Sequence, residues 1–426
     1  MKHFVTGIGI MTAVLTGSAS FGAGLWLYEG GTPDVGAAIA GRAALASDAS
    51  TASANPAGMT QLDRSQMLVA LQGLYLNAKF DTELSAFGGG NGGNAGGFIP
   101  SGGFHYAHRI NEDVSVGLSL GSYFGLGVDY ASDWAGRYYI TEADLITFGV
   151  NPGIGYRVND WLSVGAGFSV MYAELSQKVA INNAAATAQP GVPDGELVLE
   201  DDDVAYGFNL GLLVEPRSGT RIGLTYRSEI DLEFRNVASA RDVALPLQGL
   251  LAMSGLAGSQ VDLNMTVPQA IMLSAYQELT SRWAIMGNIG WQEWSKFGKQ
   301  EIGLRSTESR SFTQDLDYDD TWHFALGAQY RIAPDWLWSF GIAYDTSPVD
   351  NDQGRTPDLA LDRQIRFATG LQYDLSEDVT IGGVYQYIDL GSGGIDRNDG
   401  PLKGPLKGDY SSNEIHVFAL NLIWRL

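Results

Sequence analysis

Long stretches of this chain alternate apolar with polar or small residues, and this period of two restricts the possible folds more than any other feature. In residues 322–332, tryptophan, phenylalanine, leucine, alanine, tyrosine and isoleucine stand at every second position, with mostly polar or small residues between them. Residues 146–158, 204–214 and 364–375 repeat the pattern. Because successive side chains of a strand point to opposite faces, the period predicts β-strands with one apolar face. Soluble sandwiches bury such a face, whereas membrane barrels turn it toward lipid.

The spacing of the connections distinguishes these two architectures. Short polar turns are expected at residues 111–113, 159–160, 216–220, 280–281, 334–335 and 376–378. Longer connections are expected at residues 81–97, 131–141, 182–202, 237–260, 301–314, 350–361 and 389–409. Short turns on one side and long loops on the other are typical of bacterial outer-membrane barrels. The six turns and seven loops predict an all-β membrane protein, a 14-stranded antiparallel transmembrane β-barrel over residues 65–426, with both barrel ends at the periplasmic side.

Composition excludes several other classes of protein. With 45% hydrophobic residues and 11% aromatic residues, the chain is too apolar to be disordered. The formal net charge of −22 has the wrong sign for neutralising phosphates, so we expect no nucleic-acid partner. The absence of cysteine removes disulfide scaffolds, thiolate metal sites and cysteine nucleophiles.

The N-terminus has the features of a secretory signal peptide. Lys2 and His3 precede a short apolar stretch at residues 4–15, and small residues lead to a cleavage site before Ala23. We therefore expect a signal peptide at residues 1–22, with a buried N-terminal helix as the alternative. No later run of about 18 apolar residues exists, so an exported chain of this kind is either secreted or an outer-membrane barrel.

Tryptophans and the last strand also favour the barrel. Trp161, Trp283, Trp336 and Trp338 adjoin short turns, whereas Trp134, Trp291, Trp294 and Trp322 lie toward long loops. This distribution predicts two aromatic girdles, one at each membrane interface. Residues 418–426 are apolar at alternate positions up to the terminus, which predicts a last strand that pairs with the first and closes the barrel.

The segment at residues 23–64 has no strand pattern and is rich in alanine, glycine and serine. Thr32, Pro33 and Asp34 predict the start of a short helix that continues to about Ala44. Asn55 and the proline after it predict a second helical turn. Since a 14-stranded barrel has a lumen too wide for side chains alone to fill, we expect this segment to be a partly helical hatch (plug) in the lumen.

The hatch and several barrel segments resemble the FadL family of outer-membrane long-chain fatty-acid and hydrocarbon transporters. The resemblance extends over essentially the whole chain after the signal peptide, and no single motif is decisive. It is carried by residues 23–29, the region of Asp48, the sequence Asn55-Pro56-Ala57, and residues 98–130, 154–174, 267–294 and 345–366.

The resemblance implies a passive route for hydrophobic molecules. An extracellular groove would correspond to the apolar residues of the loop at 237–260, although these residues could instead pack against one another. An apolar lumen pocket would include the first residues after the signal peptide. The groove residues are Leu245, Leu247, Leu250, Leu251, Met253 and Leu256, and the pocket residues are Leu25, Trp26 and Leu27.

Family members also have a kinked third strand that opens a lateral gap in the barrel wall. The matching stretch is residues 122–127, which contains Gly125 and Gly127. Glycine is expected where a strand bends, so we expect the kink here, with ordinary wall glycines as the alternative.

The polar lumen residues leave the substrate undecided. Ser122 matches a polar pocket residue, but where fatty-acid transporters hold basic residues this chain has Asp319, and only Lys178 near the second position. His323, Arg331 and Arg366 face the lumen by strand parity, where they could bind a carboxylate or pair with Asp362 or Asp374. Fatty acids are therefore the first expectation, and neutral alkanes or aromatic hydrocarbons are the alternative.

Catalytic motifs are absent from the sequence. His105 and His108 are three residues apart on an expected strand and therefore point to opposite faces, which makes a poor metal site. We expect no enzyme activity, no cofactor and no metal, with a barrel lipase and a nonspecific porin as weaker alternatives. The expected partners are hydrophobic small molecules, outer-membrane lipid and lipopolysaccharide, and the expected state is a monomer in the outer membrane of a Gram-negative bacterium.

Overall fold

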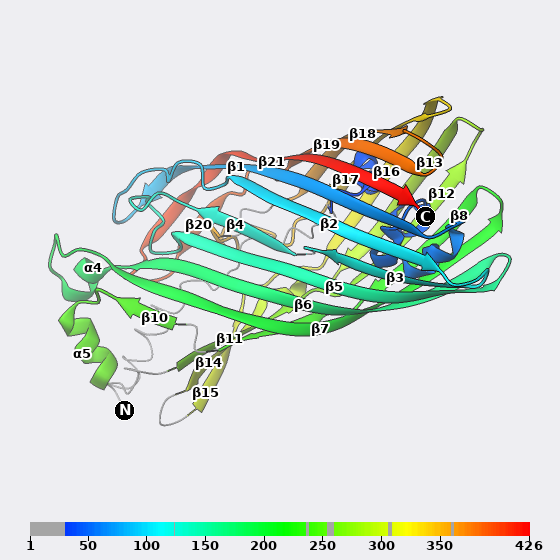
Figure 1. The fold of residues 1–426 in the computed structure, drawn as a ribbon. Helices are drawn as coiled ribbons and strands as arrows, with labels where there is room; N and C mark the ends of the chain where they lie inside the picture. Colours follow the sequence, from blue (N-terminus) through cyan, green and yellow to red (C-terminus); the bar gives the residue numbers. More distant parts are fainter. Residues whose placement is uncertain (1–29, 123, 236–237, 254–259, 306–308, 359–361) are drawn as a thin grey trace.

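The computed structural model describes residues 30–122, 124–235, 238–253, 260–305, 309–358 and 362–426. In these residues the chain forms a closed antiparallel barrel of fourteen wall strands (Figure 1). The wall strands are β1 (Gln66–Ser85), β2 (Phe98–Arg109), β3 (Val114–Gly121) continued by β4 (Gly125–Asp129), β5 (Glu142–Asn159), β6 (Leu162–Ile181), β7 (Gly195–Arg217), β8 (Thr220–Arg227), β12 (Ala270–Glu278), β13 (Trp283–Gln292), β16 (Thr321–Ala333), β17 (Trp336–Asp345), β18 (Gln364–Asp374), β19 (Val379–Asp389) and β21 (Pro405–Arg425). The predicted fold class is confirmed, and the predicted signal peptide lies outside the described residues.

The first and last strands close the wall. β1 pairs with β21 from Gln66 opposite Arg425 to Ser85 opposite Leu406. Phe418, Leu420 and Trp424 point outward and are exposed, whereas the alternate residues from Val417 to Ile423 are buried. The alternation that identified the strands is thus an outward apolar band, as a barrel in lipid requires. Among the described residues, no helix is long and apolar enough to cross a membrane.

Five of the eight tryptophans used for the girdles are exposed on the outer surface. Trp161, Trp283, Trp336 and Trp338 adjoin the short turns, and Trp322 lies at the other interface. Two of the remaining tryptophans contradict the girdle prediction, because Trp134 and Trp294 are buried among the extracellular connections. Trp134 stacks on Tyr130 with ring centroids 4.0 Å apart, so it belongs to an internal core rather than to the lipid interface.

The extracellular connections contain regular structure that the sequence pattern did not reveal. The expected loop at residues 301–314 includes two strands of a second, four-stranded sheet, which extends away from the wall beside β7 and lies below it in the view of Figure 1. Its strands are β9 (Ile230–Phe234), β11 (Gln260–Val267), β14 (Lys299–Arg305) and β15 (Ser309–Asp315). The remaining elements are β10 (Ala238–Arg241), which pairs with β7, β20 (Ile395–Asn398), which pairs with β21, and the helices α4 (Asn183–Thr187), α5 (Leu245–Met253) and α6 (Trp294–Phe297).

The hatch consists of four short helical segments inside the barrel (Figure 1). They are the 3-10 helices η1 (Pro33–Ala37) and η2 (Pro56–Gln61) and the α-helices α2 (Arg42–Leu45) and α3 (Thr51–Ala54). The predicted helix through Ala44 was wrong in extent, because the backbone turns left-handed at Ala38 and Ile39, with φ of 51° and 59°. The predicted turn after Asn55 is confirmed, since the Asn55 side chain accepts a hydrogen bond from the Ala57 amide.

Hydrogen bonds from the barrel wall hold the hatch in place. Asn288 accepts a hydrogen bond from the Gly41 amide at 2.7 Å and donates one to the Ile39 carbonyl at 2.6 Å. The wall also approaches the hatch so closely at Gly223 that a Cβ there would lie 1.9 Å from the Ala43 carbonyl oxygen. Lumen-facing glycine therefore makes room for the plug, which accounts for some of the 55 glycines in the chain.

Candidate lateral gap and lumen chamber

The barrel wall is interrupted between β2 and the strand that follows β3. β2 pairs with β3 as far as Gly103 opposite Gly121, and among the described residues β4 pairs only with β5. Beyond the interruption, the Asp129 amide donates a hydrogen bond to the Ala95 carbonyl at 2.8 Å, which joins the two sides again. Among the described residues, the ladder between these two sides is thus absent from Ser122 to Val128, and we call this stretch the lateral gap.

Gly125 is where the strand changes course. The pairing with β5 passes from Gly121 opposite Gly149 to Gly125 opposite Ile146, so three residues on one strand oppose two on the other. Such a bulge bends the strand and interrupts its ladder. Gly125 has a φ of +152°, and a Cβ there would lie 2.5 Å from the Leu145 carbonyl oxygen, so only glycine fits without a shift.

Phe124 connects the lateral gap to the lumen. Its side chain is fully buried and packs against Phe297 and Trp294, with ring centroids 5.7 and 6.5 Å away. These rings belong to a large apolar cluster that includes Met171 on β6 and Met265 on β11. The interior of the barrel above the hatch is therefore apolar where it meets the gap, and we use the name lumen chamber for this region of packed apolar side chains.

The other predicted gap residues lie at the same place. Ser122 is half-buried between β3 and β4, and its hydroxyl contacts the Phe124 carbonyl at 3.5 Å. Gly127 lies in β4, where a Cβ would meet only the flexible end of the Asp144 side chain. Gly127 is thus sterically less constrained than Gly125. Leu25, Trp26 and Leu27 lie outside the described residues.

His323 and Arg366 meet at a buried carboxylate. Asp345 lies 2.8 Å from His323 Nδ1 and accepts a hydrogen bond from Arg366 Nε at 3.0 Å. Arg366 also donates a hydrogen bond to Gln364 at 2.8 Å. Strand register produces the cluster, because His323 lies opposite Asp345 on one neighbour and Asp345 lies opposite Gln364 on the other. Arg366 thus pairs with Asp345, which was not among the expected partners Asp362 and Asp374.

Lys178 does not reach the lumen. It has the same strand parity as Tyr172, which is exposed on the outer surface, and its amine forms an ion pair with Glu142 at 2.6 Å. The preceding residue, Gln177, is fully buried on the inward side. Successive residues of a strand point to opposite faces, so an error of one position in matching this strand to the family is enough to place Lys178 on the wrong face.

The expected groove segment includes the helix α5. Leu245 is exposed, whereas Leu247 is buried against β6 and β7. Leu250, Leu251 and Met253 lie in the same helix, and Leu256 lies outside the described residues. Leu247 lines a small cavity with eight other residues, namely Tyr138, Val179, Ala180, Ile181, Asn182, Leu197, Leu402 and Lys403.

The sequence Asn55-Pro56-Ala57 lies where the hatch is hydrogen-bonded to the wall. The fully buried Asn55 amide donates hydrogen bonds to the Ala43 carbonyl at 2.6 Å and to the Leu212 carbonyl of β7 at 3.1 Å. One side chain therefore links two parts of the hatch to the barrel. Pro56 begins the 3-10 helix η2, and Ala57 is buried within it.

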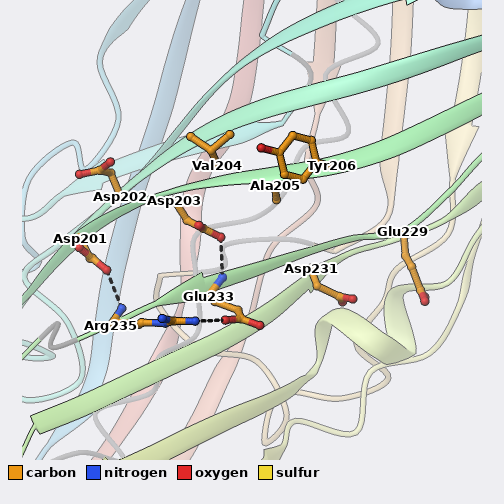
Figure 2. Close-up of a pocket in the computed structure, with 10 residues that line it drawn as sticks. All are labelled: Asp201, Asp202, Asp203, Val204, Ala205, Tyr206, Glu229, Asp231, Glu233 and Arg235. Atoms are coloured by element: carbon orange, nitrogen blue, oxygen red, sulfur yellow. Dashed lines mark hydrogen bonds and ion pairs between the residues drawn. The ribbon is translucent and has the colours of Figure 1, made fainter.

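An acidic pocket of about 550 Å³ lies where the four-stranded sheet separates from the wall (Figure 2). Asp201 accepts a hydrogen bond from the Arg235 amide at 2.5 Å, and Asp203 accepts one from the Glu233 amide at 2.8 Å. Carboxylates thus replace the missing ladder between β7 and β9. Within the described residues, no group of three or more His, Cys, Asp or Glu side chains is arranged to hold a metal ion.

A family model matches residues 12–425, and its description is "Outer membrane protein transport protein (OMPP1/FadL/TodX)". The chain belongs to this family. It is therefore an outer membrane transport protein of a Gram-negative bacterium. The match includes both the hatch and the complete wall, so family membership applies to the whole architecture described above.

Curated relatives of this FadL-family chain have similar length. The "Long-chain fatty acid transport protein" of Escherichia coli O6:H1 is 28% identical over 407 residues, which cover 89% of this chain and 90% of the relative. "Outer membrane protein P1" of Haemophilus influenzae is 25% identical and covers 90% of this chain and 94% of its own length.

Solved structures of the family have the same fold. A FadL homologue from Pseudomonas aeruginosa matches with a TM-score of 0.84 at 20% identity, over 95% of this chain and all of that one. The Pseudomonas putida toluene transporter TodX matches with a TM-score of 0.64 at 16% identity, over 89% of this chain and 94% of its own.

Sequence reasoning missed three residues of the FadL-family interior. The sequence shows Phe124 as an apolar residue beside the expected kink at Gly125. Its inward direction could not be predicted, because it depends on the bulge in the strand. Asp345 was within a family segment, yet its partners follow from register between strands distant in sequence. Gln177 was one position from Lys178, and only the structure separates their faces.

Proposed function

We propose that this FadL-family protein mediates passive uptake of hydrophobic molecules, with long-chain fatty acids as the first candidate. The substrate would rest at the extracellular groove beside α5, enter the lumen chamber and leave through the lateral gap into the membrane. The observation that carries the proposal is the interruption of the wall at residues 122–128, directly beside the buried ring of Phe124. An apolar interior beside an opening in the wall suits a substrate that passes into lipid.

The thermodynamics of an apolar chain favour this route. Each buried methylene gains roughly 0.8 kcal/mol relative to water, so a long acyl chain would cross a water-filled pore poorly. Exit through the wall lets the substrate move from apolar side chains to lipid without crossing water. Downhill diffusion and consumption in the cell then suffice, and no energy source is required.

A second candidate is the uptake of neutral hydrocarbons by the same path. Two observations support it: Lys178 is on the outer face, and Arg366 is already paired with Asp345. Neither basic group is therefore free to receive a carboxylate without losing a partner. The structural neighbour TodX is described as a toluene transporter, and the curated relatives are described as fatty acid transporters.

Two other functions are disfavoured. A nonspecific porin needs an open lumen, whereas the hatch bonds to several wall strands here. A barrel lipase is disfavoured because the family and its curated relatives are described as transport proteins. We further propose that the protein acts as a monomer, surrounded by outer-membrane lipid and lipopolysaccharide.

The absence of native cysteine makes the route testable with a single thiol. The Ser122→Cys variant would be expressed in a Gram-negative strain that lacks its own transporter, and uptake of radiolabelled oleate and of radiolabelled toluene would be measured. A bulky methanethiosulfonate reagent should reduce uptake at least tenfold, and dithiothreitol should restore it, because the added group fills the lateral gap reversibly.

The matched control is Ser281→Cys, which places the thiol in an exposed periplasmic turn. Its modification should leave uptake unchanged. Uptake of oleate alone supports the fatty-acid function, and uptake of toluene alone supports the hydrocarbon function. Transport that continues after complete labelling of Ser122→Cys contradicts lateral exit, and free passage of small sugars with neither probe taken up favours a porin.

A further inference from the structure

A separate polar cavity of about 230 Å³ lies at the periplasmic end of the lumen. Leu45 and Ser47 of the hatch line one side of it, and seven wall strands contribute the rest. It is thus separated from the lumen chamber by the hatch itself. The wall residues are Arg221, Tyr276, Gln329, Arg331, Leu337, Gln372, Asp374, Thr380, Ile423 and Arg425.

The cavity is basic in a strongly acidic protein. Arg221, Arg331 and Arg425 contribute three positive charges, and Asp374 contributes one negative charge. The chain as a whole has a net charge of −22. Because the guanidinium stays protonated at every physiological pH, this local excess of positive charge is permanent.

None of these three arginines forms an ion pair with a carboxylate within the described part of the chain. Two other inward-facing arginines are paired. Arg42 lies 2.5 Å from Asp34, and Arg366 lies 3.0 Å from Asp345. Carboxylates thus compensate these two guanidiniums, whereas the three guanidiniums of the periplasmic cavity have no such partner among the described residues.

Neutral groups hold the three guanidiniums around the cavity. Arg221 lies over the Tyr276 ring at 4.4 Å, and Arg425 donates a hydrogen bond to the Thr380 hydroxyl at 2.9 Å. Arg331 donates one to the Pro334 carbonyl at 2.9 Å. These contacts fix the side chains but use few of the five N–H donors on each guanidinium. Arg221 Nε is buried and has no hydrogen-bond partner among the described residues.

We propose that this periplasmic cavity binds a small oxyanion, a carboxylate or a phosphate group, between Arg221, Arg331 and Arg425. Both groups accept the paired hydrogen bonds that a guanidinium donates, and either would relieve the repulsion among three like charges. The cavity accommodates one such group and is too small for a folded partner. The site lies on the opposite side of the hatch from the proposed transport route, so it does not depend on that route.

Isothermal titration calorimetry on the full-length mature protein in mild detergent tests the site. Inorganic phosphate and propionate would be titrated separately at low ionic strength, where charges are least screened. We expect saturable binding of at least one of them with a stoichiometry near one. The Arg221→Gln/Arg331→Gln double variant should bind at least tenfold more weakly.

Arg217→Gln is the matched control, because Arg217 is exposed at the nearby turn between β7 and β8. It should bind as the unmodified protein does, and all variants should keep the heat-dependent gel shift of a folded barrel. Preference for phosphate assigns a phosphate ligand, and preference for propionate assigns the carboxylate of an organic acid. The proposal is overturned if neither probe binds saturably, or if the control loses as much affinity as the double variant.

Discussion

Phe124 and Phe297 pack edge to face, with ring centroids 5.7 Å apart, beside the stretch where the barrel wall loses its ladder. One ring comes from the bulged third strand and the other from α6 in the connection between β13 and β14. The inner edge of the lateral gap is therefore formed by two segments that are far apart in the chain. A substitution in either segment would therefore alter the packing of side chains at the lateral gap.

Gly125→Trp should block transport. The Cβ would lie 2.5 Å from the Leu145 carbonyl oxygen, so the backbone at this position must shift, and we expect the displaced strand and the large ring to obstruct the lateral gap. We expect uptake of radiolabelled oleate or toluene to fall at least tenfold. The heat-dependent gel shift should persist, because the other seams of the barrel are unchanged.

Gly383→Trp is the control for that variant. Gly383 lies on β19 with an ordinary backbone conformation, and a Cβ there would make only a 3.8 Å contact with Leu420. The same large side chain should then be tolerated on the outer face. Equal uptake by the Gly125 variant and the unmodified protein would refute exit through the gap.

Asn55→Ala should loosen the hatch. It removes the hydrogen bonds to the Ala43 and Leu212 carbonyls, and each buried group left without a partner costs about 1–3 kcal/mol. We expect larger or more frequent conductance steps in planar bilayers, because the hatch would move away from its position in the lumen more often. Asn111→Ala, in an exposed periplasmic turn, is the control. Unchanged conductance in Asn55→Ala would show that other contacts hold the hatch alone.

Asp345→Asn should destabilise the barrel. It removes the charge that Arg366 and His323 share, and breaking a buried ion pair on one side typically costs about 3–5 kcal/mol. The temperature of the heat-dependent gel shift should fall. Asp396→Asn is the comparison, because Asp396 pairs with Lys407 at a half-exposed position and such pairs contribute only about 0–1 kcal/mol. A similar shift for both variants would contradict the buried role of Asp345.

The extracellular connections should respond to pH through two buried groups. Burial raises the pKa of Asp358 to about 8, so the folded protein holds a proton there that the unfolded chain releases near pH 4. This contribution to stability is complete below pH 4 and is lost as pH rises to about 8. Burial lowers the pKa of Lys403 to about 7, so its contribution is complete above about pH 10 and is lost as pH falls to about 7.

The two effects predict a minimum of stability between about pH 7 and 8. Differential scanning fluorimetry from pH 5 to 9 would show it as a dip in the melting temperature. Asp358→Asn should remove the decline between pH 5 and 7, because the amide does not titrate. Asp352→Asn changes an exposed carboxylate of the same connection and should leave the dip in place. A flat profile for the unmodified protein would count against these pKa shifts.

The sequence predicted the wall better than the extracellular region. Lipid imposes a strict period of two on wall strands, so strand number, turns and the inward direction of His323 and Arg366 could be read directly. The strands β14 and β15 pack against other protein segments instead of lipid, and so they lack that signal. Trp134 also lies in an extracellular connection that lacks this period. Its position toward a long loop led to the prediction that it lies at the interface, whereas it stacks on Tyr130 in an internal core.

Within the site, local features were predictable and register was not. Gly125 predicted a bend, because glycine adopts backbone conformations that other residues avoid, and the φ of Gly125 is +152°. The partner of Arg366 could not be identified in the same way, because Asp345 reaches it through the pairing of β17 with β18. The prediction for Lys178 was wrong because the inward-facing residue is its neighbour Gln177. Strand parity predicts the face of a residue only when its position in the strand is known to the residue.

The attachment of the hatch also constrains how the protein is made. Residues of the hatch precede β1 directly, and they bond to β7, β12 and β13 on the far side of the lumen. If β1 paired with β21 first, this segment would have to be threaded afterwards into a ring already shut. We therefore expect the plug to occupy the lumen before the seam between the first and last strands closes, so the contacts of the finished barrel constrain the order of its assembly.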